Sequence, residues 1–168
     1  LTMIKEAPKV MANPEDYEAR ANIMWAGMVA HNNLCGVGRE QDWSSHAIEH
    51  ELSALYDVAH GAGLAVIFPA WMKYVMKHDV NRFAQIAVRV WGCHMDFANP
   101  ENTAMEGIRR LEKFWKSLGL PLTFKELGAK EEDIPYMVKK IGLKEGEHIG
   151  SFVPLYNEDI EKIYRLAL

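Results

Sequence analysis

The chain has 168 residues, enough to bury a substantial core, and its composition of 49% apolar and 25% charged residues is typical of one globular domain. Its net charge of -4 leaves it without the basic surface that would bind nucleic acid or an anionic membrane. No apolar run approaches the roughly 20 residues that span a bilayer. The two cysteines, Cys35 and Cys93, are too few for a disulfide framework, which predicts a cytoplasmic protein.

Helix signals begin with the first residues. The sequence from Leu1 already follows a helical pattern without a capping residue, so we expect a fragment that enters a longer protein partway through a helix. Asn13-Pro14-Glu15-Asp16 supplies an N-cap, a proline suited to the first helical position and acids that favour the positive end of the helix dipole. These signals predict a helix from Tyr17 to Leu34 that ends near Gly36.

The same signals recur along the rest of the chain. A buried helix is expected over 64–72, kinked or restarted by Pro69, and Asp79 is expected to cap the next one. Pro135 predicts either a helix start or an irregular first turn. Further helices are expected at 80–93, 99–118, 131–141 and from 157 to the end. Because sustained period-two alternation is absent, we predict an all-α fold with one domain over 1–168.

Three histidines, His46, His50 and His60, fall within fifteen residues. Neutral imidazole is the commonest protein metal ligand and titrates nearest to neutral pH, so this cluster is the best candidate for chemistry. Ser44 or Ser45 can cap a helix that carries His46 and His50 at i and i+4, on one face.

His60 lies fourteen residues after His46. In one continuous helix the two would be about 21 Å apart, too far to share an ion bound at about 2.0–2.1 Å. The chain must therefore turn between them if both are ligands, and Gly61 and Gly63 are placed for such a turn. Spacing alone does not distinguish a metal or catalytic site from a structural role of the histidines. In the structural alternative His46 and His50 are polar residues on a half-exposed helix, and His60 caps a helix C-terminus.

Other chemistries have weaker signals. The zinc-protease motif HExxH is absent, since Ala54 stands where its second histidine would be. His78-Asp79 with Asp96 downstream loosely resembles the ligand set of all-α metal phosphohydrolases, although Asp79 is equally explained as a helix cap. A further alternative is a self-standing all-α binding or scaffold domain whose histidines are structural.

The segments His46-Ala-Ile-Glu-His50-Glu-Leu-Ser-Ala and His60-Gly-Ala-Gly-Leu-Ala-Val-Ile-Phe-Pro69 resemble the iron-containing (group III) alcohol dehydrogenases, in particular their butanol dehydrogenase-type branch. The likeness extends over essentially the whole chain, including 17–26, Asp42-Trp43 and 152–160. It implies the all-α C-terminal helical domain of the dehydroquinate synthase-like, iron-type alcohol dehydrogenase fold. In the complete enzyme an N-terminal α/β domain would bind the nicotinamide cofactor.

The resemblance also implies roles for the three histidines. The family holds a divalent ion, Fe²⁺ or Zn²⁺, by an aspartate and three histidines, two of which match His46 and His60. His50 matches a histidine beside the nicotinamide and the substrate that assists hydride and proton transfer, so it is the catalytic and cofactor-binding candidate. The implied protein is a homo-oligomeric, NAD(P)H-dependent oxidoreductase of small alcohols and aldehydes.

This sequence departs from the family by omission. The family's aspartate and first histidine form an Asp-x3-His motif, and no such motif precedes His46. We therefore expect that the N-terminal cofactor domain and two of the four metal ligands lie outside this chain. The 168-residue piece alone is then predicted to bind metal weakly and to show no dehydrogenase turnover.

Overall fold

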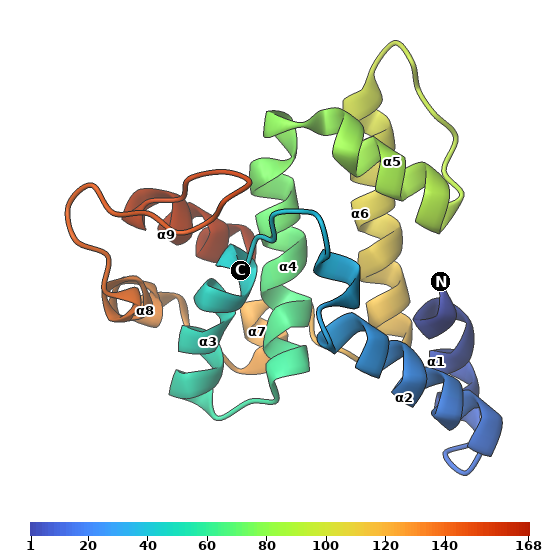
Figure 1. The fold of residues 1–168 in the computed structure, drawn as a ribbon. Coiled ribbons are helices and arrows are strands. Elements are labelled where there is room, and N and C mark those ends of the chain that lie inside the picture. The colour runs from blue at the N-terminus through green and yellow to red at the C-terminus, as the bar shows by residue number, and fades with distance from the viewer. The chain divides into compact units, whose positions relative to one another are not determined.

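The computed structural model describes residues 1–168, which form helices and no β-strand; one isolated antiparallel bridge joins Ile149 to Leu155. The predicted all-α fold is confirmed. The chain divides into two compact units, Leu1–Gln41 and Asp42–Leu168 (Figure 1). No helix combines the length and apolar character that crossing a membrane requires.

The first unit is a helical hairpin in which α1 (Thr2–Ala12) packs along α2 (Tyr17–His31), followed by a 3-10 turn at Leu34–Gly36. The start of α2 at Tyr17 is as predicted, but its cap is Asp16, whose carboxylate accepts a 2.9 Å hydrogen bond from the Ala19 N–H. Asn13 instead accepts from the Glu15 N–H in the preceding turn. The predicted extension of the helix to Leu34 is wrong, because the chain leaves α2 at His31 and takes a left-handed conformation at Asn33.

The second unit contains the remaining helices, and most of them lie within a few residues of the predicted ranges. The helices are α3 (Ser44–Tyr56), α4 (His60–Val75), α5 (Val80–Trp91), α6 (Pro100–Ser117), α7 (Phe124–Leu127), α8 (Ile134–Ile141) and α9 (Asn157–Leu166). As predicted, the Asp79 carboxylate caps α5 by accepting from the Arg82 N–H, and Pro135 lies in the first turn of α8, after a 3-10 turn. The four-residue α7 was not predicted, since so short a segment carries no periodic signal.

Helix α4 is central in the second unit, where it packs against α3, α6, α7 and α9 (Figure 1). Its apolar sequence suits this position, and Val66 and Ile67 are almost completely buried. Pro69 does not restart the helix, which continues to Val75. The largest fully buried side chains around α4 come from six helices: Ile48, Leu52, Ile67, Ile108, Phe124, Ile134, Met137, Ile160, Ile163 and Tyr164.

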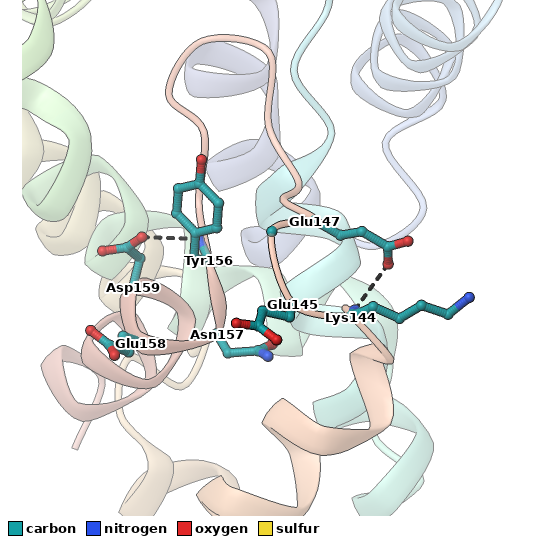
Figure 2. Close-up of a pocket in the computed structure, with 8 residues that line it drawn as sticks. Lys144, Glu145, Glu147, Tyr156, Asn157, Glu158 and Asp159 are labelled. Carbon is teal, nitrogen blue, oxygen red and sulfur yellow. Dashed lines mark hydrogen bonds between the residues drawn. The ribbon is translucent and has the colours of Figure 1, made fainter.

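An open hollow of about 330 Å³ lies between the turn at 144–147 and the start of α9 (Figure 2). It is rich in carboxylates, two of which have local structural roles. Glu147 accepts a 2.9 Å hydrogen bond from the Lys144 N–H, and Asp159 accepts one of 2.9 Å from the Tyr156 N–H. Both bonds stabilise the turn and the helix start, and none of the three clustered histidines lines the hollow.

Candidate metal centre

Asp42 holds the start of the helix that carries His46 and His50. Neither Ser44 nor Ser45 caps α3 with its side chain as predicted; both are buried inside its first turn. The Asp42 carboxylate accepts from the Ser44 N–H at 2.8 Å and from the Ser44 hydroxyl at 2.5 Å. Its second oxygen accepts from the N–H groups of Ser151 and Phe152 at 2.9 and 2.8 Å. One carboxylate therefore joins the start of α3 to a loop more than a hundred residues later.

The charged form of Asp42 is stabilised by this arrangement. Partial burial of the carboxylate by itself raises its pKa, but the hydrogen bonds from the Ser44 side chain and from three backbone N–H groups outweigh burial, and the pKa is lowered from its usual value. The indole N–H of Trp71, on α4, donates a 2.9 Å hydrogen bond to the same Ser44 hydroxyl. These contacts fix the direction of α3 where it presents His46.

A turn separates His46 from His60, as the distance argument required. Helix α3 ends at Tyr56, Asp57 has a left-handed φ of 51°, and α4 begins at His60. The turn residues are 57–59, so the prediction that Gly61 and Gly63 would form the turn is wrong; both lie within α4. The alternative that His60 caps a helix C-terminus is also wrong, because His60 opens a helix.

The turn brings the three imidazoles together. The ring centroids are 5.3 Å apart for His46 and His60, 5.2 Å for His50 and His60, and 6.5 Å for His46 and His50. Two imidazoles that bind one ion at about 2.0–2.1 Å place their centroids roughly 5 Å apart. His60 can therefore share an ion with either partner, whereas the pair on α3 is more widely spaced. Trp43 packs edge-on against His46, with ring centroids 4.9 Å apart.

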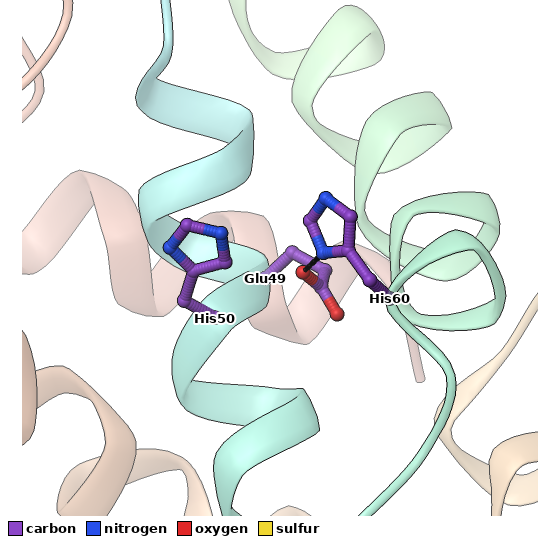
Figure 3. A group of neighbouring side chains, drawn as sticks. All are labelled: Glu49, His50 and His60. Atoms are coloured by element: carbon purple, nitrogen blue, oxygen red, sulfur yellow. Dashed lines mark hydrogen bonds and ion pairs between the residues drawn. The ribbon is translucent and has the colours of Figure 1, made fainter.

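A buried carboxylate lies behind these rings. Glu49 is fully buried on α3, and one of its oxygens contacts Nδ1 of His60, whose side chain is 47% exposed (Figure 3). The other oxygen, Oε1, is buried and has no hydrogen-bond partner. An imidazole whose second nitrogen contacts a carboxylate suits a divalent cation, because the buried negative charge favours a positive charge at the exposed side of the ring.

Gly63 makes room for this carboxylate. A Cβ atom at position 63 would lie 2.1 Å from Oε1 of Glu49 and 2.8 Å from its Cδ, both far inside contact distance. Any larger residue would displace the Glu49 side chain. The glycine predicted to allow a turn therefore serves a close approach between α3 and α4.

Donor geometry alone groups Glu49, His50 and His60, each of which offers a ligand atom within 4.8 Å of the others. The resemblance implied a different pair, His46 and His60. Both sets share His60. They differ in whether His46 is a ligand and in whether Glu49 and His50 bind the ion or lie beside it.

The profile described as the Fe-containing alcohol dehydrogenase family, C-terminal, matches residues 1–168. The chain belongs to this family. It is 39% identical over 165 residues to the NADH-dependent butanol dehydrogenase A of Clostridium acetobutylicum. The aligned residues make up 98% of this chain and 42% of that protein. It is 35% identical over 144 residues to the NADPH-dependent aldehyde reductase YqhD of Escherichia coli, covering 84% of this chain and 36% of that protein.

Solved structures of the family have the same fold. The NADH-dependent butanol dehydrogenase A of Thermotoga maritima superposes with a TM-score of 0.92 at 39% identity, over 99% of this chain and 43% of that chain. The substrate- and cofactor-free aldehyde reductase YqhD of Escherichia coli gives a TM-score of 0.91 at 30% identity, over 100% of this chain and 44% of that chain. The chain thus spans about two fifths of the length of these Fe-containing alcohol dehydrogenase relatives.

Family membership and structure together argue against the competing interpretations. His78 lies exposed at the end of a 3-10 turn and Asp79 caps α5, so neither belongs to a phosphohydrolase site. Asp96 accepts hydrogen bonds from the Ala98 and Asn99 N–H groups and caps its own loop. The match to the Fe-containing alcohol dehydrogenase family favours an enzyme domain over a scaffold domain of an unrelated family.

Two residues of the site, Asp42 and Glu49, were given no role from the sequence, and Gly63 was given the wrong one. Glu49 had one usable signal, since it shares the apolar stripe of α3 with Ile48 and Leu52, which are fully buried. An acidic residue on a buried stripe requires a partner. The partner itself, His60, could not be named without the crossing of α3 and α4.

Proposed function

We propose that this chain is the C-terminal metal-binding domain, 1–168, of an NAD(P)H-dependent alcohol or aldehyde oxidoreductase of the butanol dehydrogenase type. The observation that supports this most directly is the convergence of His46, His50 and His60 at the turn between α3 and α4. The relatives support the choice of reaction, since they are NADH-dependent butanol dehydrogenases and an NADPH-dependent aldehyde reductase.

In this proposal His46 and His60 hold a divalent cation. The 5.3 Å between their ring centroids fits two imidazoles on one ion, and each comes from a different helix. Imidazole suits both Fe²⁺ and Zn²⁺; we propose Fe²⁺ on the strength of the family description. In this proposal the remaining ligands and the nicotinamide site lie in a part of the full-length protein outside these 168 residues.

His50 has a different role in the proposal. It is exposed, it lies on the same face of α3 as His46, and its ring centroid is 5.2 Å from that of His60. An exposed imidazole beside a metal site is suited to take up or release the proton of an alcohol. We therefore assign His50 to the substrate oxygen and the nicotinamide rather than to the metal. The bound cation supplies a Lewis acid that polarises that oxygen.

The experiment measures NAD(P)H oxidation with butanal by the full-length protein and by the 168-residue chain. The full-length protein is expected to oxidise NAD(P)H in the presence of butanal, and the 168-residue chain alone is expected to show no turnover. A His50→Ala variant of the full-length protein should lose at least about 100-fold in turnover, because general acid–base catalysis contributes about 10²–10⁴-fold. Turnover by the 168-residue chain, or unchanged turnover in His50→Ala, would contradict the proposal.

Two further proposals concern the protein as a whole. We propose a homo-oligomer in the cytoplasm that acts on small alcohols and aldehydes. Sedimentation of the full-length protein measures its oligomeric state, and a single species of monomer mass would contradict the proposed homo-oligomer. A series of aldehydes of increasing chain length measures the size of the substrate pocket.

A further inference from the structure

We propose that Glu49 is a positioning residue for His60: its buried carboxylate accepts the Nδ1–H of the imidazole and so presents Nε2 as the metal-binding nitrogen. The inference deepens the proposed function and rests on it for the metal. The orientation of the His60 ring by Glu49 is a property of the protein alone and can be measured without a metal.

The contact itself is between an exposed ring and a fully buried acid. Glu49 is 0% exposed, and its Oε2 contacts Nδ1 of His60, which opens α4. Figure 3 shows the two side chains reaching toward each other across the gap between α3 and α4, with the second ring nitrogen of His60 directed away from the carboxylate. The other nitrogen, Nε2, is thus not occupied by the carboxylate, and the His60 side chain is 47% exposed.

The chemistry of the pair determines which nitrogen carries the proton. An ionised carboxylate only accepts hydrogen bonds, and a neutral imidazole has one N–H and one acceptor nitrogen. Because Oε2 faces Nδ1, the proton of the neutral ring lies on Nδ1, and Nε2 keeps its lone pair for a cation. Carboxylates that accept from metal-bound histidines commonly fix the tautomer and increase ligand basicity in this way.

Burial makes this contact hard to replace. Burying a carboxylate is costly unless it is paired and hydrogen-bonded, and Oε1 of Glu49 has no partner. His60 contacts the other oxygen, Oε2. Loss of the imidazole would leave Glu49 without that partner, so the two residues act as a unit.

Gly63 belongs to the same unit. It lies three residues after His60 on α4, and an added Cβ would come within 2.1 Å of Oε1 and 2.9 Å of Cγ of Glu49. Glycine at 63 is thus required for the position that Glu49 takes, and through it for the orientation of His60. Removing the Glu49 side chain would remove the clash, so the two substitutions should compensate for each other.

The competing interpretation is that Glu49 binds the ion directly, since its oxygen lies within 4.8 Å of ligand atoms on His50 and His60. Direct ligation would take Oε2 away from Nδ1 of His60. In the metal-free protein both interpretations allow this contact. They differ in how the glutamine variant binds metal, because its amide oxygen still accepts a hydrogen bond but lacks the charge of a ligand.

The first experiment records ¹⁵N NMR spectra of the metal-free full-length protein and determines which ring nitrogen of His60 carries the proton. We expect the Nδ1–H tautomer in the unaltered chain and in Glu49→Gln, and a mixture of tautomers in Glu49→Ala. Should Glu49→Ala fail to fold by circular dichroism, Glu49→Ala/Gly63→Ala fills the vacated space and carries the same measurement. An unchanged tautomer after removal of the carboxylate would overturn the proposal.

The second experiment measures Zn²⁺ affinity of the full-length protein by competition with a chromophoric chelator. Glu49→Ala is expected to weaken binding by about 10–100-fold, the usual loss for a residue that orients a ligand, and Glu49→Gln by less. Gly63→Ala should weaken binding as Glu49→Ala does, and the double variant should be no weaker than either. Equal, complete loss of Zn²⁺ in Glu49→Ala and Glu49→Gln would instead identify a direct ligand.

His60→Ala separates this inference from the proposed function. If His60→Ala abolishes Zn²⁺ binding while Glu49→Ala leaves it unchanged, the metal site stands and the positioning role is wrong. If His60→Ala leaves Zn²⁺ binding unchanged, the proposed metal site is wrong, and the ¹⁵N spectra still decide whether Glu49 orients the ring.

Discussion

The phenolic O–H of Tyr164, on α9, donates a 2.6 Å hydrogen bond to the main-chain carbonyl of Ile48, on α3. Both residues are fully buried and lie 116 positions apart in the chain. Burial, with Glu51 and Glu49 nearby, raises the pKa of Tyr164 well above its usual value, so the hydroxyl remains a donor at any physiological pH. This bond therefore fixes α9 to α3 at the residue that precedes Glu49.

Replacing Tyr164 with phenylalanine should lower the free energy of unfolding by about 1 kcal/mol, the usual net value of one intramolecular hydrogen bond. The ring and its packing against Phe124 are kept, so the loss reports the hydroxyl alone. Urea denaturation measures the effect. Tyr136→Phe is the matched control, since Tyr136 is 51% exposed, and it should change stability little. Equal stabilities for the two variants would show that the bond to Ile48 is not stabilising.

Asp42→Asn should destabilise the chain in a pH-dependent manner. The pKa of Asp42 is lowered in the folded state, so its charge stabilises the fold fully above the unfolded value of about 3.9, and this stabilisation is lost as the pH falls toward the folded value. The difference in unfolding free energy between the unaltered chain and Asp42→Asn is therefore expected to be constant from pH 7 to 5 and to shrink below about pH 4. Denaturation curves across this range measure it; a difference that grows on acidification would contradict the assignment.

The contact between α5 and α6 offers a test of close packing. A Cβ at Gly107, on α6, would lie 2.5 Å from Cβ of Ala87, on α5. Gly107→Ala is expected to lower the free energy of unfolding by about 1–3 kcal/mol, as overpacking commonly does. Gly27→Ala, inside α2, is the control: its Cβ would meet nothing closer than 4.0 Å, so alanine should stabilise by up to about 1 kcal/mol. Stabilisation by both substitutions would contradict the packing of α5 on α6.

Much of this fold could be predicted because its helix ends depend on local chemistry. Asp79 caps α5 as predicted, and α6 ends at Ser117, next to the predicted end at 118, with Gly119 at a φ of 81° just beyond it. The start of α2 was predicted correctly, but its capping residue was not: Asn13 bonds within its own turn, so Asp16 caps the helix. Bond lengths require a turn between His46 and His60 if both bind one ion, and the structure has a turn there.

The parts of the site that escaped prediction depend on contacts between distant segments. Asp42 binds the N–H groups of Ser151 and Phe152, which are 109 and 110 positions away, and no pattern around Asp42 marks them. Gly63 looked like a turn residue because glycine permits both turns and close approach, and only the crossing of α3 and α4 distinguishes these uses. Family resemblance supplied the roles of the histidines, but not the carboxylate behind His60.

In the proposed site His46 and His60 hold the metal, while His50 acts on the substrate. Metal content of the purified full-length protein, measured by mass spectrometry after dialysis, tests it most directly in three variants. His46→Ala and His60→Ala are each expected to lose at least nine tenths of the bound metal, because each removes a ligand, and His50→Ala is expected to keep it while losing turnover. Metal retained in His46→Ala, or lost in His50→Ala as fully as in His60→Ala, would contradict the account.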